Sequence, residues 1–212
     1  MLRKYQLPRY TVIIFIAGMF LIGMTNDWAA AEQNTPLPRT NAAQSYTVVD
    51  TQDFSAGYGR TRKSLCIASD AETFTARAHT AIRAALDLER DTGADYIQVA
   101  ITPIADMGCS DYFTAIAGYS SDGRGITGNE ENHFWEVKAS DVVLDIEERL
   151  VLKAWQEAKD DFEVNGDIDI EGMKQYLSRQ LNLSPEKVED YWLKSVEMGL
   201  SMRPYPLQGI RQ

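Results

Sequence analysis

The chain has 212 residues, a formal net charge of −10 and two cysteines. An acidic excess of this size argues against binding to nucleic acid or docking on anionic lipid, because both surfaces are themselves polyanionic. It favours solubility, with basic proteins or cations as the charged partners.

Residues 1–31 have the layout of a secretory signal peptide. Three basic residues precede an uncharged apolar run at positions 10–24, and Ala29–Ala31 then supply the small residues that signal peptidase requires. The apolar run is shorter than the roughly 20 residues that span a bilayer. We therefore expect cleavage after Ala31 and export to the periplasm or the exterior. The alternative is an uncleaved segment that anchors the protein in the inner membrane.

A polar, proline-containing and flexible lead-in is expected at 32–45, followed by an α+β domain at 46–140. Alternation and β-favouring residues predict strands at 46–54, 62–69, 95–103, 112–119 and 133–140, with one helix at 71–93. The loops between successive strands are too short for parallel crossovers. The sheet should therefore be mostly antiparallel, in the order β-β-α-β-β-β, with the helix packed on one face.

The expected helix has one apolar face that consists largely of alanine. Its members repeat at three- and four-residue spacing: Phe74, Ala78, Ala81, Ile82, Ala85 and Leu86. Asp70 is placed to cap the start of this helix and Gly93 to end it. Arg77 and His79 fall at or beyond the border of the apolar face, where we expect exposed or boundary side chains.

After Ser140 the pattern changes to an acidic three-helix segment. Periodicity predicts helices at 141–162, 168–183 and 184–200, and residues 141–200 hold 15 Asp and Glu against 7 Lys and Arg. The tail at 201–212 is expected to be loose. Three aromatic residues are candidate anchors for a protein partner, although aromatics at helical spacing are more often core residues: Trp155, Tyr191 and Trp192.

The acidic loop at 161–172 matches part of an EF-hand calcium loop. Its candidate metal ligands carry side-chain oxygens: Asp161, Glu163, Asn165, Asp167 and Asp169. The match is degenerate, because Gly172 stands where the loop requires a bidentate Glu. The alternative interpretation is a corner in which Asn165-Gly166 forms the turn and Asp167 or Asp169 caps the next helix. Calcium at this loop is the one cofactor that the sequence indicates.

The two cysteines, Cys66 and Cys109, allow two interpretations. An even number of cysteines in an exported chain suggests a disulfide. The alternative is a pair of free, buried thiols that behave as small hydrophobic residues. Neither cysteine belongs to a recognisable catalytic set, since Cys109 has no histidine close to it in the sequence.

Three runs within residues 46–140 carry a resemblance to a known family. They are YTVVDTQDFSAGYGRTRKSLCIAS, AHTAIRAALDLERDTGADYIQVAI and AIAGYSSDGRGITG followed by HFWEVKASD. Together they resemble an uncharacterised bacterial family of small exported α+β proteins, a domain of unknown function. The resemblance implies an α+β domain and carries no established activity, and the acidic helical segment lies outside it.

These observations predict an exported, non-enzymatic module that binds another protein of the cell envelope through its acidic helical segment. The enzymatic alternative is an exported hydrolase that uses carboxylates, although carboxylates are so abundant here that no pair is informative. The third hypothesis is weak calcium binding through the loop at 161–172. A membrane contact is expected only through the N-terminal segment, if it is not cleaved.

Overall fold

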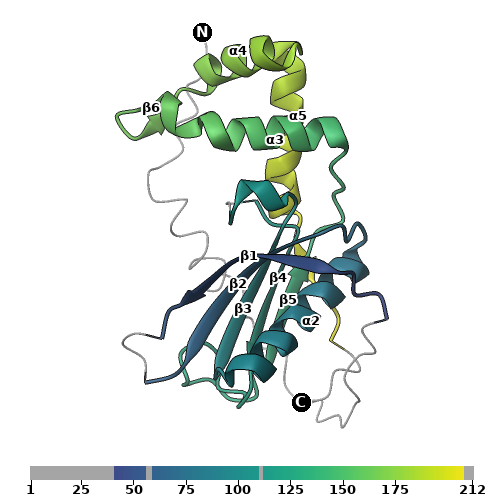
Figure 1. Ribbon diagram of the computed structural model, residues 1–212, viewed down its shortest axis with the longest axis vertical. Coiled ribbons are helices and arrows are strands. Elements are labelled where there is room, and N and C mark those ends of the chain that lie inside the picture. The colour runs from purple at the N-terminus through teal and green to yellow at the C-terminus, as the bar shows by residue number, and fades with distance from the viewer. Residues whose placement is uncertain (1–40, 56–58, 110–111, 208–212) are drawn as a thin grey trace.

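The computed structural model describes residues 41–55, 59–109 and 112–207. These form a six-stranded sheet with one helix on one face and three further helices beyond one end of the sheet (Figure 1). The order across the sheet is β1 (Tyr46–Asp53), β2 (Arg62–Ser69), β3 (Tyr96–Thr102), β4 (Ala115–Ser120), β5 (Trp135–Ala139) and β8 (Arg203–Pro204). The α+β class and the five longer strands are therefore confirmed.

The sheet is mostly antiparallel, as predicted, with one exception next to the edge strand β1. Strands β2 and β3 are parallel, whereas each of the other neighbouring pairs is antiparallel. The helix α2 (Phe74–Thr92) supplies the long crossover that a parallel connection needs. This places the carboxyl ends of β2 and β3 and the amino end of α2 at the same edge of the sheet.

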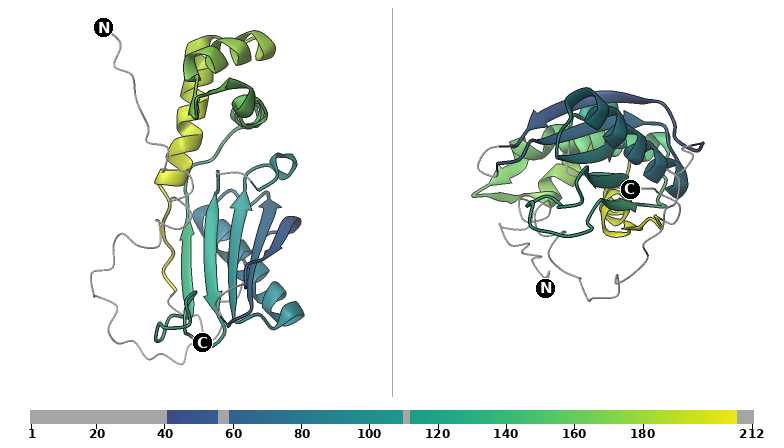
Figure 2. Two further views of the ribbon diagram at one scale, coloured as in Figure 1. Left: turned by 90° about the vertical axis from the view of Figure 1, so that its left-hand side faces the viewer. Right: turned by 90° about the horizontal axis from the view of Figure 1, so that it is seen from below.

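Helix α2 covers one face of the sheet, and the left view of Figure 2 shows the strands side by side with this helix behind them. Its face of small residues lets the helix approach the strands closely, and the core between them is almost free of solvent. The buried members of this core are Leu65, Ile67, Ala78, Ala81, Ile82, Ala84, Ala85, Ala94, Ile97, Val99, Ile101, Ala115, Ala117, Val137 and Ala139. The helix begins later than predicted, because Thr73 and not Asp70 caps it, and it ends at Gly93 in the left-handed conformation.

Three helices make up the acidic segment: α3 (Ile146–Ala158), α4 (Ile170–Leu181) and α5 (Pro185–Leu200). Asp145 and Glu148 form a capping box at the start of α3, and Ser184 and Pro185 begin α5 as predicted. A separate core holds the three helices together and includes Val151, Trp155, Met173, Leu177 and Val188. The helical segment therefore has apolar packing of its own, next to that of the sheet.

The short elements connect these parts. They are the 3-10 turns η1 (Ala105–Met107) and η2 (Lys159–Phe162) and the two-residue strands β6 (Glu163–Val164) and β7 (Asp167–Ile168). Within the described residues, no helix is both long enough and apolar enough to cross a membrane. The expected signal peptide at 1–31 and most of the lead-in lie outside the described residues.

The expectation of a loose tail was wrong for residues 203–207. Strand β8 pairs with the edge strand β5, and the amide of Tyr205 donates to the carbonyl of Val137 at 2.8 Å. Tyr205 and Leu207 also pack against the core of the sheet. An edge strand offers unpaired backbone groups, and this tail covers part of that edge.

Candidate functional site

The acidic loop at 161–172 folds as a tight β-hairpin. Glu163 pairs with Ile168 and Val164 with Asp167, and the two turn residues, Asn165 and Gly166, both have positive φ. Paired residues share a face of the hairpin, so the side chains of Glu163 and Asp167 point to opposite faces. The turn between them is the corner that the dipeptide Asn-Gly indicates.

The remaining candidate ligands of this loop are also separated. Asp161 belongs to η2, and the carboxylate of Asp169 accepts from the amide of Gly172 at 3.0 Å as the N-cap of α4. In the part of the chain that the structure describes, no three His, Cys, Asp or Glu side chains lie where they could hold a metal ion. Calcium binding by this loop stays a prediction, and the hairpin geometry does not assemble its five oxygens.

The three candidate aromatic anchors have different surroundings. Trp155 is 3% exposed and stacks on Trp192, with ring centroids 4.7 Å apart and an angle of 13° between the planes. The indole nitrogen of Trp192 donates to the hydroxyl of Tyr112 at 3.3 Å, and the hydroxyl of Tyr191 donates to Glu147 at 2.7 Å. Trp155 is thus a core residue, because its ring is already covered by the helices around it. It does not present the free anchor that the sequence suggested.

The two cysteines are joined in a disulfide, which decides between the two interpretations of the sequence. Cys66 is buried in β2 and Cys109 follows η1, with Cα atoms 5.8 Å apart. The bond holds the η1 loop against the sheet. The same loop contacts α3, where Lys153 approaches Asp106 at 3.5 Å. The disulfide therefore fastens a loop that lies between the sheet and the helical segment.

Helix α3 carries apolar side chains on its solvent-facing side. Ile146 is 80% exposed and Leu150, one turn later, is 55% exposed; Val143, in the segment just before the helix, is 42% exposed. The opposite side of the helix, with Val151, Leu152 and Trp155, is buried. The helix therefore carries apolar side chains on both sides, and none of the described residues covers Ile146 or Leu150.

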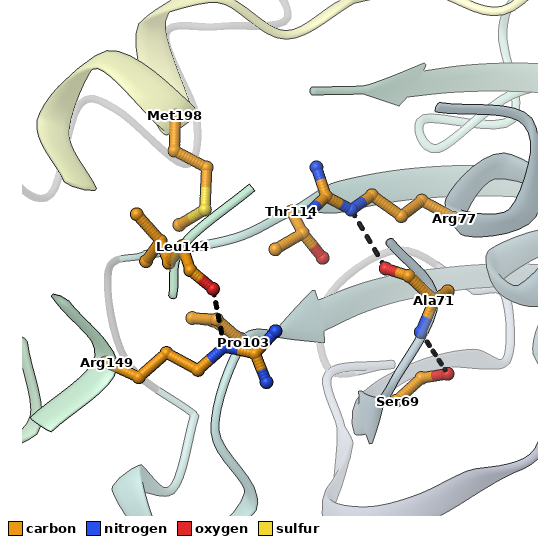
Figure 3. A pocket seen from close by; sticks show the side chains of 8 residues that line it. All are labelled: Ser69, Ala71, Arg77, Pro103, Thr114, Leu144, Arg149 and Met198. Atoms are coloured by element: carbon orange, nitrogen blue, oxygen red, sulfur yellow. Dashed lines mark hydrogen bonds between the residues drawn. The ribbon is translucent and has the colours of Figure 1, made fainter. Parts of the chain in front are cut away.

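A small recess lies where the sheet meets the helical segment (Figure 3). It spans about 240 Å³, part of which is open solvent, and is lined by Ser69, Ala71, Arg77, Pro103, Thr114, Leu144, Arg149 and Met198. These residues come from the carboxyl ends of β2 and β3, the start of α2, the helices α3 and α5, and the segments just before β4 and α3. The interior is narrow, with space for about one water-sized group.

Arg77 enters the recess from the first part of α2 and is only 2% exposed. Its Nε donates to the carbonyl of Ala71 at 3.0 Å, and its Nη1 donates to the carbonyls of Ser140 and Val142 at 2.6 and 2.8 Å. These bonds tie α2 to the connection between β5 and α3. Burial lowers the pKa of Arg77, and the positive charge of Arg149 lowers it further.

Arg149 approaches the recess from α3, on the side opposite Arg77 (Figure 3). Its Nε donates to the carbonyl of Leu144 at 3.0 Å, which turns the guanidinium back along the start of the helix. Among the described residues, no carboxylate lies within ion-pair distance of Arg77 or of Arg149. Two cations thus face one recess of an acidic protein without a bonded counter-ion.

The sequence did not single out either arginine. Arg77 was assigned to the polar border of the helix, yet its side chain is buried and lines the recess. One signal was available: a basic residue close to the start of a helix meets the positive end of the helix dipole, where it is unfavourable without a special partner. Arg149, on a helix surface rich in charge, offered no comparable signal.

The fold and the junction recess define an α+β domain with an integrated helical segment. The chain belongs to the family described as "Domain of unknown function (DUF4875)", whose model matches residues 41–193. This match confirms the resemblance to an uncharacterised family and extends it. The family domain does not stop at residue 140 but includes α3, α4 and part of α5.

A solved structure shares the fold. It is described as a DUF487 family protein from Desulfovibrio piger, with a TM-score of 0.61 and 20% sequence identity over 80% of this chain and 99% of that chain. At this identity the likeness supports the fold alone. A search of curated proteins gave no match to the chain.

Proposed function

We propose that this protein is an exported, non-enzymatic module of the cell envelope that binds a basic protein partner through the outer face of α3. The observation that carries the proposal is the exposed apolar pair Ile146 and Leu150 on α3, with Val143 exposed just before the helix; we call these three residues the α3 outer face. Apolar side chains at one-turn spacing on a helix are typical of a surface that docks against another protein.

The charge of the helical segment supports a basic partner. Residues 141–200 carry 15 acidic and 7 basic side chains, a net charge of −8 around the α3 outer face. Complementary charge speeds association and excludes acidic competitors, while the apolar contacts supply the affinity. The layout of residues 1–31 supports export, which would place this partner in the envelope.

The state of the carboxyl groups favours binding over carboxylate catalysis. A carboxylate hydrolase needs one acid whose pKa is raised so that it can donate a proton. Among the described residues, the carboxyl groups with a displaced pKa are all displaced downward, by the ion pairs and hydrogen bonds that they form: Asp53, Asp95, Asp122, Glu147, Glu171 and Glu186. These six carboxyl groups therefore stay ionised at neutral pH.

The proposal is tested by crosslinking the full chain in the envelope and identifying the captured protein. The double variant Ile146→Asp/Leu150→Asp should lose a specific basic partner, because both side chains lie at the centre of the outer face. The control is Leu193→Asp, which places one of these two added negative charges at another exposed apolar position, 49% exposed, on α5.

The purified partner should bind the wild-type chain and the Leu193→Asp variant alike, and more weakly at high salt. The Ile146→Asp/Leu150→Asp variant should bind at least about tenfold more weakly, a loss of about 1.4 kcal/mol. Equal binding by the double variant, with its fold verified by circular dichroism, would contradict the proposal.

A further inference from the structure

The recess at the junction holds positive charge with which no carboxylate of the described residues forms an ion pair. Arg77 is buried, and its bonds are to carbonyl oxygens of Ala71, Ser140 and Val142. A carbonyl dipole lowers the cost of burying a cation, but it does not supply a counter-charge. Arg149 adds a second cation on the other side of the same recess.

The nearby carboxylates do not supply the counter-charge by direct contact. Asp141 and Glu72 are the acids whose charges act on Arg77, and both tend to raise its pKa. Asp141, however, is bonded to Arg203 on the tail, and Glu72 is exposed. Neither carboxylate forms an ion pair with Arg77 among the described residues.

Hydrogen bonds within the fold use only some of the N–H donors of Arg77 and Arg149. The Nε and Nη1 atoms of Arg77 form the hydrogen bonds that join α2 to the segment before α3. Its Nη2 has no acceptor among the described residues, and the same is true of both Nη atoms of Arg149. Two planar donor groups therefore keep free N–H bonds beside one recess.

The hydroxyl groups of the recess are already engaged. Ser69 donates to the carbonyl of Ser45 at 2.8 Å, and Thr114 donates to the carbonyl of Ile101 at 3.3 Å. The remaining lining residues, Ala71, Pro103, Leu144 and Met198, have apolar side chains. The free donors that face the recess are thus those of the two arginines.

We propose that this recess is a binding site for a carboxylate group, held between the guanidinium groups of Arg77 and Arg149. A carboxylate is planar and carries two acceptor oxygens, which matches the forked donors of arginine. The interior has room for about one water-sized group, which is enough for one oxygen of a carboxylate. This site is distinct from the α3 outer face and does not depend on the function proposed for that face.

The position of the recess in the fold adds to its affinity for an anion. It lies at the carboxyl ends of the parallel strands β2 and β3 and next to the start of α2, where the helix dipole is positive. A bound carboxylate would join α2 of the sheet domain to α3 of the helical segment. Binding should therefore also stiffen the junction between the two parts.

The test uses the full chain, labelled with ¹⁵N, and follows the Nε–Hε signals of Arg77 and Arg149 by NMR. Sodium formate is the probe, and sodium chloride at equal ionic strength is its control. We expect saturable shifts of both signals with formate, at a dissociation constant of about 1 mM, and no matching saturation with chloride. The signal of Arg179, an exposed arginine at the end of α4, should not move.

Three variants make the test specific. Arg149→Gln removes one fork without touching the bonds of Arg77, and should weaken formate binding about tenfold or more. Arg149→Lys keeps the charge but loses the forked guanidinium donors, and its affinity for formate should lie between that of Arg149→Gln and that of the wild type. Arg179→Gln changes the net charge equally and should bind as the wild type does. Absence of saturation with formate, or equal affinity in Arg149→Gln, would overturn the proposal.

The same titration separates the two sources of a carboxylate. A short peptide with a free carboxyl terminus that binds more than about tenfold tighter than formate, while its amidated form does not bind, identifies a polypeptide as the source. Equal affinities for formate and for the peptide identify a small free acid. In either case the shifts must depend on Arg149.

Discussion

The Nε2 atom of His79 lies 2.7 Å from the hydroxyl oxygen of Tyr205, although 126 residues separate them in the chain. His79 is nearly buried on α2, and its ring meets that of Tyr205 edge-on with centroids 5.4 Å apart. Phe74 and Arg203 complete the contact, with the guanidinium of Arg203 over the Phe74 ring at 3.8 Å. These contacts fasten the C-terminal strand to the helix that covers the sheet.

The contact between His79 and Tyr205 should make the free energy of unfolding depend on pH. Burial lowers the pKa of His79 below its ordinary value of 6.5, so the unfolded chain binds a proton at higher pH than the folded chain does. The contribution of His79 is therefore complete above pH 6.5 and is lost as the pH falls through the lower pKa of the folded state. The free energy of unfolding should decline by less than about 1.4 kcal/mol per pH unit in this range.

The variant His79→Gln isolates this effect, because glutamine can bond to Tyr205 but does not titrate. Urea unfolding between pH 7 and pH 5 should give a shallower decline for the variant than for the wild type. The acids with lowered pKa, such as Asp122, lose their contribution only at lower pH, since their ordinary values lie near 4. Identical slopes for the two proteins would refute a role of His79.

The disulfide should make a large contribution to stability. Cys66 and Cys109 are 43 residues apart, and closing a loop of that length stabilises the folded state by about 4 kcal/mol in the chain-entropy model. We expect the variant Cys66→Ala/Cys109→Ala to lose about 2–4 kcal/mol of unfolding free energy. Urea unfolding with and without reductant measures the loss. Reductant should weaken the wild type and leave the double variant unchanged.

Glu148 should stabilise the start of α3 more than its neighbour Glu147. The Glu148 carboxylate is buried. It accepts a hydrogen bond from the backbone amide of Asp145 at 2.7 Å and forms an ion pair with Lys194 on α5 at 2.6 Å. We expect Glu148→Ala to cost about 2 kcal/mol, because it breaks the capping box and leaves Lys194 unpaired beside a buried site.

Glu147→Ala is the matched control, one residue away on the same helix turn. Its ion-pair partner is Lys187, and both side chains are close to half exposed, so solvent screens the pair. Thermal unfolding of the two variants should show the clear loss for Glu148→Ala alone. Similar losses would mean that burial does not distinguish the two ion pairs.

The hairpin at 163–168 should not behave as a calcium loop. Glu163 and Asp167 point to opposite faces, and Asp169 is already the N-cap of α4. We expect the melting temperature with about 1 mM calcium, a concentration at which extracellular sites fill, to equal that with a chelator. A rise that disappears in the variant Asp161→Asn/Glu163→Gln would show that the loop rearranges around the ion.

The sequence by itself determined the local elements and the class of fold. Alternating runs mark β2 and β3, the alanine face marks α2, and Ser184-Pro185 marks the start of α5. Each of these signals is a relation between residues a few positions apart, such as a side-chain period or a cap. The Asn165-Gly166 corner belongs to the same group, since its turn is set by two adjacent residues.

Only the tertiary structure decided which distant residues meet. The pairing of Cys66 with Cys109, the stacking of Trp155 on Trp192, and the docking of Tyr205 on His79 each join positions tens of residues apart. The recess between Arg77 and Arg149 is the clearest case, because each arginine alone resembles an ordinary charge on a helix. Their convergence follows from the crossover that makes β2 and β3 parallel and from the packing of α3 and α5 above that edge, which no local pattern encodes.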